Sequence, residues 1–182
     1  MYATETAGLW TSAHQYYVMG ALEGFGVDGF SYTGFNGLLA PLSAEGEIAA
    51  PGTCAVIMTG TELGTIKTTV TVYQKEPPAP DLTQWDDVVE ASLFFSDAEP
   101  YIVDVHDRVL FSVLTSLQRA PFRLRVHARG RDQGYEFLRD ESEDDEDEWS
   151  PEEHLLQAWP APFAPLIEWQ LHDTFGAGIR AS

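Results

Sequence analysis

The chain has 182 residues, 44% of them hydrophobic and 12% aromatic, which is enough to form a single domain with its own core. No stretch approaches the roughly 20 apolar residues of a membrane-spanning helix. The first ten residues also lack the basic start and apolar run of a secretory signal. Cys54 is the single cysteine, so an internal disulfide is excluded. Together these features predict a cytoplasmic protein that does not bind membranes.

The chain is strongly acidic. Its formal net charge is −19, and residues 140–153 contain ten acids and no base. Without those ten carboxylates the formal charge is still −9, so the acidity is not confined to one segment. The net negative charge disfavours direct binding to nucleic acid or to an anionic membrane, because it repels phosphate groups. It favours a basic protein partner, or it serves solubility alone.

Strand patterns dominate much of the chain. Short runs with alternating polarity, β-branched residues or flanking turn residues occur at 10–19, 53–59, 65–73, 85–95, 101–105 and 109–114. In 85–95, Val89, Ala91 and Leu93 share one face, with Glu90 on the other. The glycine-rich stretch 20–39 is interpreted either as a loop packed by its own aromatic side chains or as a strand pair. Seven or eight short strands with such punctuation predict a mainly β fold, a single antiparallel β-sandwich over residues 1–182.

The segment 122–129 alternates strictly between apolar and mostly basic residues. Its apolar positions are Phe122, Leu124, Val126 and Ala128, and its polar positions are Arg123, Arg125, His127 and Arg129. The apolar side is expected in the core, and the other side is predicted to be a solvated outer face. The alternative is an anion or phosphate site formed by Arg123, Arg125 and Arg129, because guanidinium groups suit such ligands.

A long acidic loop is predicted over 132–152, because the acids of 140–148 repel one another and cannot be buried. Three interpretations stay open: a disordered, solvated loop, a cover over the arginine face, and a docking element for a basic protein. An EF-hand calcium site is excluded, because the run lacks the required order of acids and glycine.

The segment after the acidic run has two possible structures. Ser150-Pro151-Glu152-Glu153 has the residue types of a helix start, but Pro160 leaves room for little more than two turns. We therefore interpret 154–159 as a strand that pairs with 122–129. The proline-rich tail 160–182 is expected to dock on its own domain through the apolar residues between 166 and 175.

No catalytic or cofactor motif is found. The five histidines lack metal-ligand spacing, and Cys54 lies in an apolar run typical of a buried, inert thiol. Gly24-x-Gly26-x-x-Gly29 has the letters of a dinucleotide motif but no preceding apolar strand. We predict no catalytic residue, no metal and no cofactor. The open alternative is an enzyme with an unrecognised site, for instance one using Asp104, His106 and Asp107.

Ser12-Ala13-His14-Gln15-Tyr16-Tyr17-Val18 resembles the opening strand of the competence protein J family, whose members inhibit DNA-entry nucleases. The glycine-rich stretch, the run around Val56, the run 68–73 and the strand starting at Trp85 follow the same order of elements. The resemblance spans residues 9–130 and implies a small, acidic, all-β inhibitor. A second stretch, 122–160, is similar to uncharacterised proteins of high-GC actinobacteria, a likeness that implies no function.

These observations predict a protein-binding module, an inhibitor or immunity-type antagonist of a cationic enzyme such as a nuclease. Inhibition is expected to be steric. Trp149 is expected to anchor the partner. The residues expected to steer association are four acids of the run: Asp144, Asp145, Glu146 and Asp147. The alternative function is a small-ligand or anion sensor that uses Arg123, Arg125 and Arg129, with the acidic loop as a gate.

Overall fold

The structure is a computed structural model that describes residues 2–20, 35–43, 47–49, 51–95, 99–103, 109–117, 119–137 and 149–182. Its strands are β1 (Tyr2–Ser12), β2 (Gln15–Met19), β3 (Leu39–Leu42), β4 (Cys54–Met58), β5 (Leu63–Tyr73), β6 (Asp87–Leu93), β7 (Tyr101–Val103), β8 (Val109–Leu110), β9 (Phe122–Arg129), β10 (Trp149–Pro160) and β11 (Ile167–Leu171). The helices are a 3-10 helix (Ser112–Leu117), α1 (Arg131–Glu136) and α2 (Thr174–Arg180).

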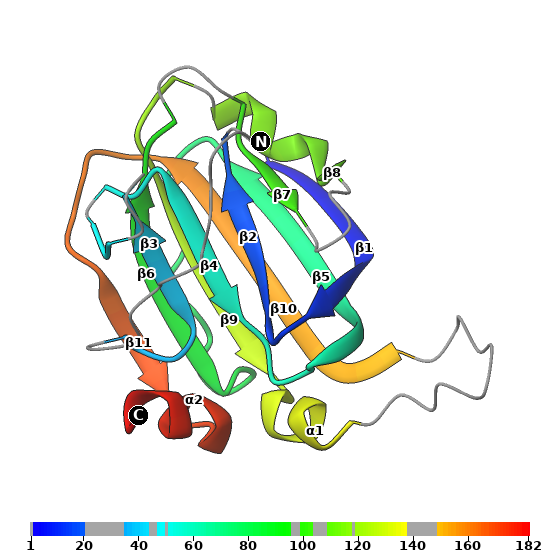
Figure 1. Ribbon diagram of the computed structural model, residues 1–182. Helices are drawn as coiled ribbons and strands as arrows, with labels where there is room; N and C mark the ends of the chain where they lie inside the picture. The colour runs from blue at the N-terminus through cyan, green and yellow to red at the C-terminus, as the bar shows by residue number, and fades with distance from the viewer. Residues whose placement is uncertain are drawn as a thin grey trace.

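All these strands belong to one sheet, which curls into an open half-barrel (Figure 1). Its order is β11-β6-β9-β10-β5-β1-β2-β4-β3, with β7 paired to β2 and β8 to β7. Neighbouring strands are antiparallel except β5 and β10, which run parallel. The mainly β class is therefore confirmed, whereas the predicted sandwich is wrong, because one sheet curls around the core instead of packing on a second sheet.

The backbone around Gly52 draws the two sides of the curled sheet together. Its N–H donates to the Ser92 carbonyl at 3.1 Å, and its carbonyl accepts from the Phe94 N–H at 2.9 Å. These bonds place Gly52, two residues before β4, against Leu93 at the end of β6. The apolar residues on the concave side pack together, and Leu114 and Leu117 of the 3-10 helix belong to the same core.

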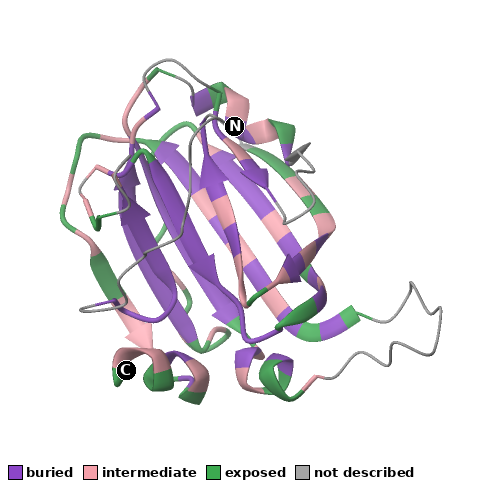
Figure 2. Cartoon of the chain, in the orientation of Figure 1, coloured by how far each residue is buried: buried purple, intermediate pink, exposed green. Residues whose placement is uncertain are grey.

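The inner face of the sheet carries the predicted core residues. Phe122, Leu124, Val126 and Ala128 of β9 are fully buried, as their alternation predicted. Figure 2 shows β6 and β9 almost wholly in purple, because the residues on both faces of these strands are buried. Each large apolar side chain removed from water in this way contributes roughly 1.5–3 kcal/mol.

The strand interpretation of 154–159 is confirmed. The segment lies in β10 and pairs antiparallel with β9, with Leu156 opposite Val126. Pairing on both sides gives this stretch its extended form, although its first residues suit a helix start. The run 10–19, in contrast, is not one strand but part of the β1–β2 hairpin, whose turn is Ala13-His14.

The arginine face of β9 is not solvated, and that prediction is wrong. Arg123 is 3% exposed and Arg125 is fully buried. Both donate to Glu90 on β6, Arg123 Nε at 2.8 Å and Arg125 Nε at 2.9 Å. The reason is a cover of irregular chain, since the carbonyls of Pro78 and Ala164 also accept from these arginines.

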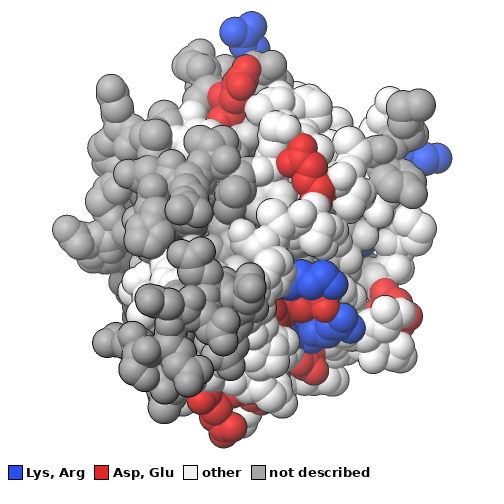
Figure 3. Space-filling model, turned by 90° about the vertical axis from the view of Figure 1, so that its right-hand side faces the viewer, with Lys and Arg blue, Asp and Glu red and all other residues white. Residues whose placement is uncertain are grey.

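Arg129 differs from the other two arginines because it is solvent-exposed. It pairs with Glu153, which also accepts from Lys67 at 2.9 Å. Figure 3 shows a place on the surface where basic and acidic side chains meet in this way. The arginines of β9 therefore face acidic side chains of the same chain.

The acidic loop was predicted over 132–152, but both ends of that stretch are regular structure. Residues 131–136 form α1 and β10 begins at Trp149. The tail docks on the same domain, with β11 paired to β6 and α2 against the end of the sheet. Within the described residues, no helix is long and apolar enough to cross a membrane.

Candidate partner-binding site

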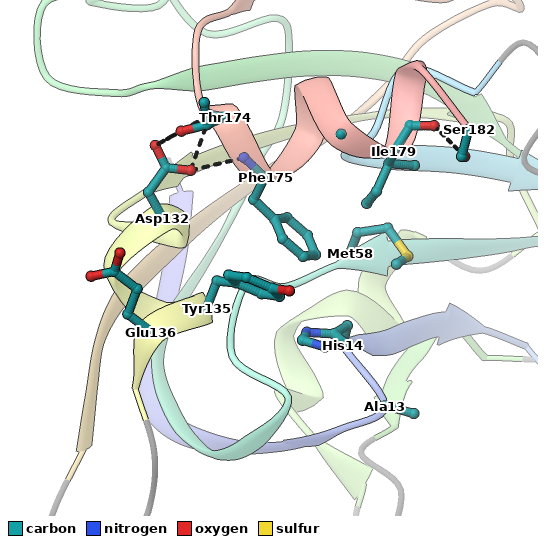
Figure 4. Close-up of a pocket in the computed structure, with 11 residues that line it drawn as sticks. Ala13, His14, Met58, Asp132, Tyr135, Glu136, Thr174, Phe175, Ile179 and Ser182 are labelled. Atoms are coloured by element: carbon teal, nitrogen blue, oxygen red, sulfur yellow. Dashed lines mark hydrogen bonds between the residues drawn. The ribbon is translucent and has the colours of Figure 1, made fainter.

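A cleft of about 620 Å³ opens at one end of the sheet, where the β1–β2 turn, α1 and α2 meet (Figure 4). His14 enters it from the turn, Tyr135 from α1 and Phe175 from α2, while Met58 comes from the end of β4. These elements are far apart in sequence, so only the fold assembles the cleft. A cleft lined by aromatic and apolar side chains with a few polar groups is typical of a binding site.

Three aromatic rings face one another in the cleft. The ring of Phe175 lies 5.4 Å from that of His14 and 5.6 Å from that of Tyr135, between centroids. His14 and Tyr135 are 5.8 Å apart. These separations are in the range in which rings attract one another. Tyr135 is nevertheless 61% exposed, so its ring is available to a further molecule.

His14 is held in an uncommon backbone conformation. Its φ is 60° and that of Ala13 is 53°, the left-handed region that favours glycine or asparagine. Each such residue costs about 1–2 kcal/mol. The ring is fixed by Nδ1, which lies 2.9 Å from the Gly60 carbonyl. Because a carbonyl only accepts, Nδ1 carries the hydrogen and Nε2 does not when the ring is neutral.

Two carboxylates lie at one side of the cleft. Asp132 accepts from the backbone N–H groups of Thr174 at 3.0 Å and Phe175 at 2.8 Å, which ties α1 to the start of α2. Partial burial alone would raise the pKa of Asp132, but the hydrogen bonds from Thr174 and Phe175 lower it overall. The Glu136 side chain is exposed, and its carboxylate has no hydrogen bond or ion pair with the described residues. No lysine or arginine is among the described residues that line the cleft.

A buried arginine fixes the two helices beneath the cleft. Arg131, at the start of α1, is fully buried and donates to Asp87 at 2.6 Å and to Asp173 at 2.5 Å. Asp173 in turn caps α2 by accepting from the Gly176 N–H at 2.7 Å. Burial, together with the Asp87 charge, raises the pKa of Asp173 against the opposing effect of Arg131. We call Arg131, Asp87 and Asp173 the arginine clamp.

Gly60 joins the clamp to the cleft. A Cβ at this position would lie 1.8 Å from the Arg131 carbonyl oxygen, so no larger residue fits without moving α1. The same residue accepts from His14, and its N–H donates to Glu152 at 3.2 Å. The backbone at Gly60 therefore positions both His14 and the first residue of α1.

Behind Gly60 lies a buried chain of hydrogen bonds. Glu152 Oε1 is 2.8 Å from His154 Nε2, and His154 Nδ1 is 2.9 Å from the Tyr16 hydroxyl. Glu152 also accepts from the Thr61 N–H at 2.8 Å. Because Tyr16, Glu152 and His154 are at most 1% exposed, this arrangement supports the strand ends and does not itself contact a ligand.

Burial affects the pKa values of two groups in this chain of hydrogen bonds, Tyr16 and Glu152. It is the largest cause of the raised pKa of the Tyr16 hydroxyl, and the Glu152 charge adds to it. For Glu152, burial alone would raise the pKa, but the hydrogen bonds from His154 and Thr61 lower it overall. The anionic form of Glu152 is therefore the one that the surrounding donors stabilise.

None of the sequence-predicted site residues that the structure describes lines this cleft. Asp144, Asp145, Glu146 and Asp147 lie outside the described residues, as do Asp104, His106 and Asp107. Trp149 is 45% exposed, but it lies beside Gly8 on the outer face of the sheet. Arg123 and Arg125 are paired with Glu90 under a covering layer, and Arg129 pairs with Glu153.

Two further sequence expectations concern reactive groups. The predicted burial of Cys54 is confirmed, and burial raises its pKa to about 12, which disfavours the reactive thiolate. In the part of the chain that the structure describes, no group of three histidine, cysteine or acidic residues is placed to bind a metal ion.

Sequence reasoning missed Tyr135 and Phe175 as site residues. His14 was noticed only as part of the motif 12–18, and nothing in the sequence brings it near residues 135 and 175. One signal was present, since Asp173 precedes α2 as an N-cap residue type. That cap predicts a helix start after residue 173, and this helix supplies one wall of the cleft.

No family model and no curated protein matches the sequence. The fold itself is one that solved structures of small mainly β proteins share. One is described as "Crocagin biosynthetic gene J", with a TM-score of 0.54 and 13% identity, covering 89% of this chain and 99% of that one.

The other is ComJ from Bacillus subtilis, described as an inhibitor of the DNA degrading activity of NucA. Its TM-score is 0.56 at 10% identity, covering 88% of this chain and 99% of ComJ. The resemblance of residues 12–18 to the competence protein J family is therefore matched by a likeness of fold.

Proposed function

We propose that the chain is a protein-binding inhibitor of an enzyme with a basic surface, such as a nuclease. The observation that carries the proposal is the cleft, which combines three facing rings with two carboxylates and has no lysine or arginine among its described lining residues. In a chain of net charge −19 such a surface suits a cationic protein and repels nucleic acid. The likeness of fold to ComJ, an inhibitor of a nuclease, supports the same class of function.

The mechanism is steric occlusion with electrostatic steering. Asp144, Asp145, Glu146 and Asp147 lie in sequence between α1, which lines the cleft, and β10. These acids accelerate the encounter with a basic partner, while buried aromatic contacts slow dissociation. Trp149 is a second anchor, because its half-exposed ring lies at the end of the same run.

The test begins with affinity capture from an extract of the native host. The captured enzyme is then purified, and its activity is measured with one equivalent of the chain. We expect inhibition, and an association rate that falls at least ~10-fold between about 50 and 500 mM NaCl. A captured enzyme that is not inhibited would overturn the proposal, and an association rate independent of salt would overturn the steering mechanism.

A matched pair of variants locates the steering charge. Residues 140–148 are replaced by a glycine-serine linker of the same length, and Glu62→Gln serves as the control at an exposed acid elsewhere. We expect slower association for the first variant, no change for the control and little change in dissociation rate for either. A gain in inorganic phosphate affinity after the replacement would instead favour the anion-sensor alternative.

A further inference from the structure

We propose that the cleft binds one arginine side chain of the inhibited partner, with the guanidinium against Tyr135 and Glu136 and the aliphatic stem along Met58 and Ile179. This inference rests on the proposed function only for the source of the arginine. The chemistry of the cleft stands on its own contacts.

The cleft has an acidic side and an apolar side, which match the cationic end and the apolar stem of an arginine side chain. Figure 4 shows Asp132 and Glu136 on one side, Met58 and Ile179 on the other, and the ring of Tyr135 between them. An arginine has an apolar stem and a cationic end, and it buries the stem while the charge stays in a polar environment. A purely apolar side chain would leave the acidic side unmatched.

The rings provide a surface for a cation. A guanidinium within about 6 Å of an aromatic centroid is attracted by the negative face of the ring. The chain already uses this contact, because Arg125 lies 4.9 Å from the Trp159 ring and 5.3 Å from the Trp169 ring. Tyr135 is the most exposed of the cleft rings and has no such partner among the described residues.

The charges of the cleft favour the same occupant. The Asp132 carboxylate is occupied by the donors of α2, but the Glu136 carboxylate is free within the described structure. A free carboxylate accepts two parallel N–H bonds from a guanidinium, a geometry that lysine cannot supply. His14 Nε2, unprotonated in the neutral ring, is a further acceptor.

The experiment uses a defined probe, the peptide Ac-Gly-Gly-Arg-Gly-Gly-NH2, and follows the ring signals of His14, Tyr135 and Phe175 by NMR. The same peptide with citrulline is the neutral control, and versions with lysine and leucine test the other occupants. We expect saturable shifts with arginine, weaker binding with lysine, and roughly tenfold weaker binding with citrulline. No saturable shift up to about 10 mM arginine peptide, or equal binding of the citrulline or leucine peptide, would overturn the inference.

Variants separate this inference from the proposed function. Tyr135→Ala and Glu136→Gln should weaken both peptide binding and inhibition, whereas Tyr135→Phe keeps the ring and should retain both. Glu62→Gln, at an exposed acid that does not line the cleft, should leave peptide binding unchanged. Full inhibition by Tyr135→Ala would overturn the arginine site and leave the inhibitor function standing. If the chain binds the arginine peptide saturably but inhibits no captured enzyme, the inhibitor function is overturned and the arginine site stands.

Discussion

The buried charge clusters and the cleft contain similar residue types but differ in how completely their polar groups are paired. In the arginine clamp, Arg131 is enclosed and has two carboxylate partners. In the cleft, the Glu136 carboxylate is free among the described residues and Tyr135 is 61% exposed. Paired, buried charges hold the fold together, and a ligand has no access to them. The exposed and unpaired groups, beside the strained backbone of His14, are the ones that a ligand can reach.

The largest expected effect is at the clamp. Arg131→Met removes the ion-pair partner of Asp173 and leaves Asp87 with only Arg180, at 3.8 Å, so we expect the free energy of unfolding to fall by about 3–5 kcal/mol. Urea denaturation measures this loss. Arg129→Met is the matched control, because its partner Glu153 lies at the surface and also pairs with Lys67. We expect this variant to lower the free energy of unfolding by less than about 1 kcal/mol. Equal losses in the two variants would show that the buried and exposed arginines do not differ as described.

The buried chain of hydrogen bonds should give the next largest effect. Glu152→Gln turns an acceptor of four donors into a group with only one acceptor atom, and we expect a loss of about 2–3 kcal/mol in urea denaturation. The neighbouring residue provides the control. Glu153→Gln, on the outer face, should cost less than about 1 kcal/mol. If Glu152→Gln lowers the free energy of unfolding no more than Glu153→Gln does, the buried hydrogen bonds of Glu152 do not stabilise the fold as described.

The pH dependence of stability tests the covered outer face. Burial, the largest cause, lowers the pKa of His127 to about 4, while the unfolded chain has the ordinary value of 6.5. Between these values the unfolded state binds more protons, so the contribution is fully present above 6.5 and is lost as the pH falls toward 4. Between pH 7 and pH 5 the loss is about 2 kcal/mol.

His127→Gln should flatten that part of the stability profile, measured by urea denaturation at several pH values. His172→Gln, at an exposed histidine, is the control and should leave the slope between pH 7 and pH 5 unchanged. A slope that survives in the His127 variant would mean that this side chain is not enclosed by the covering layer.

The smallest expected effect on stability is in the cleft itself. Tyr135→Ala removes a ring that is mostly exposed, so the free energy of unfolding should fall by less than about 1 kcal/mol. Thermal denaturation measures this change. A loss as large as that of Arg131→Met would place Tyr135 with the residues that hold the fold, and the contrast between the two regions would fail.

The sequence predicts the inner half of the fold well. Alternation in β9 identified Phe122, Leu124, Val126 and Ala128 as core residues, and the pairing of β9 with β10 followed from two compatible strands. What alternation cannot reveal is the cover on the outer face. Arg123 and Arg125 are polar residues at outward positions, and only the packed chain near Pro78 and Ala164 makes them buried.

The cleft could not be predicted from the sequence either, because the elements that form it lack local sequence signals. Ala13 and His14 are not turn-forming residue types, so the hairpin between β1 and β2 had no local signal. The six residues of α1 form too short a helix to show an amphipathic pattern. Tyr135 and Phe175 therefore had no expected position relative to His14.

The parallel pairing of β5 with β10 also has a consequence for how the chain folds. β5 ends at Tyr73, and its parallel partner β10 does not begin until Trp149, so a growing chain exposes this strand edge while residues 74–148 are made. Closure over so long a separation is slow, and an unpaired edge invites association with other chains. The sheet is therefore completed only when one of the last strands has been made. If the earlier strands fold during synthesis, the edge of β5 keeps unpaired backbone N–H and C=O groups until then.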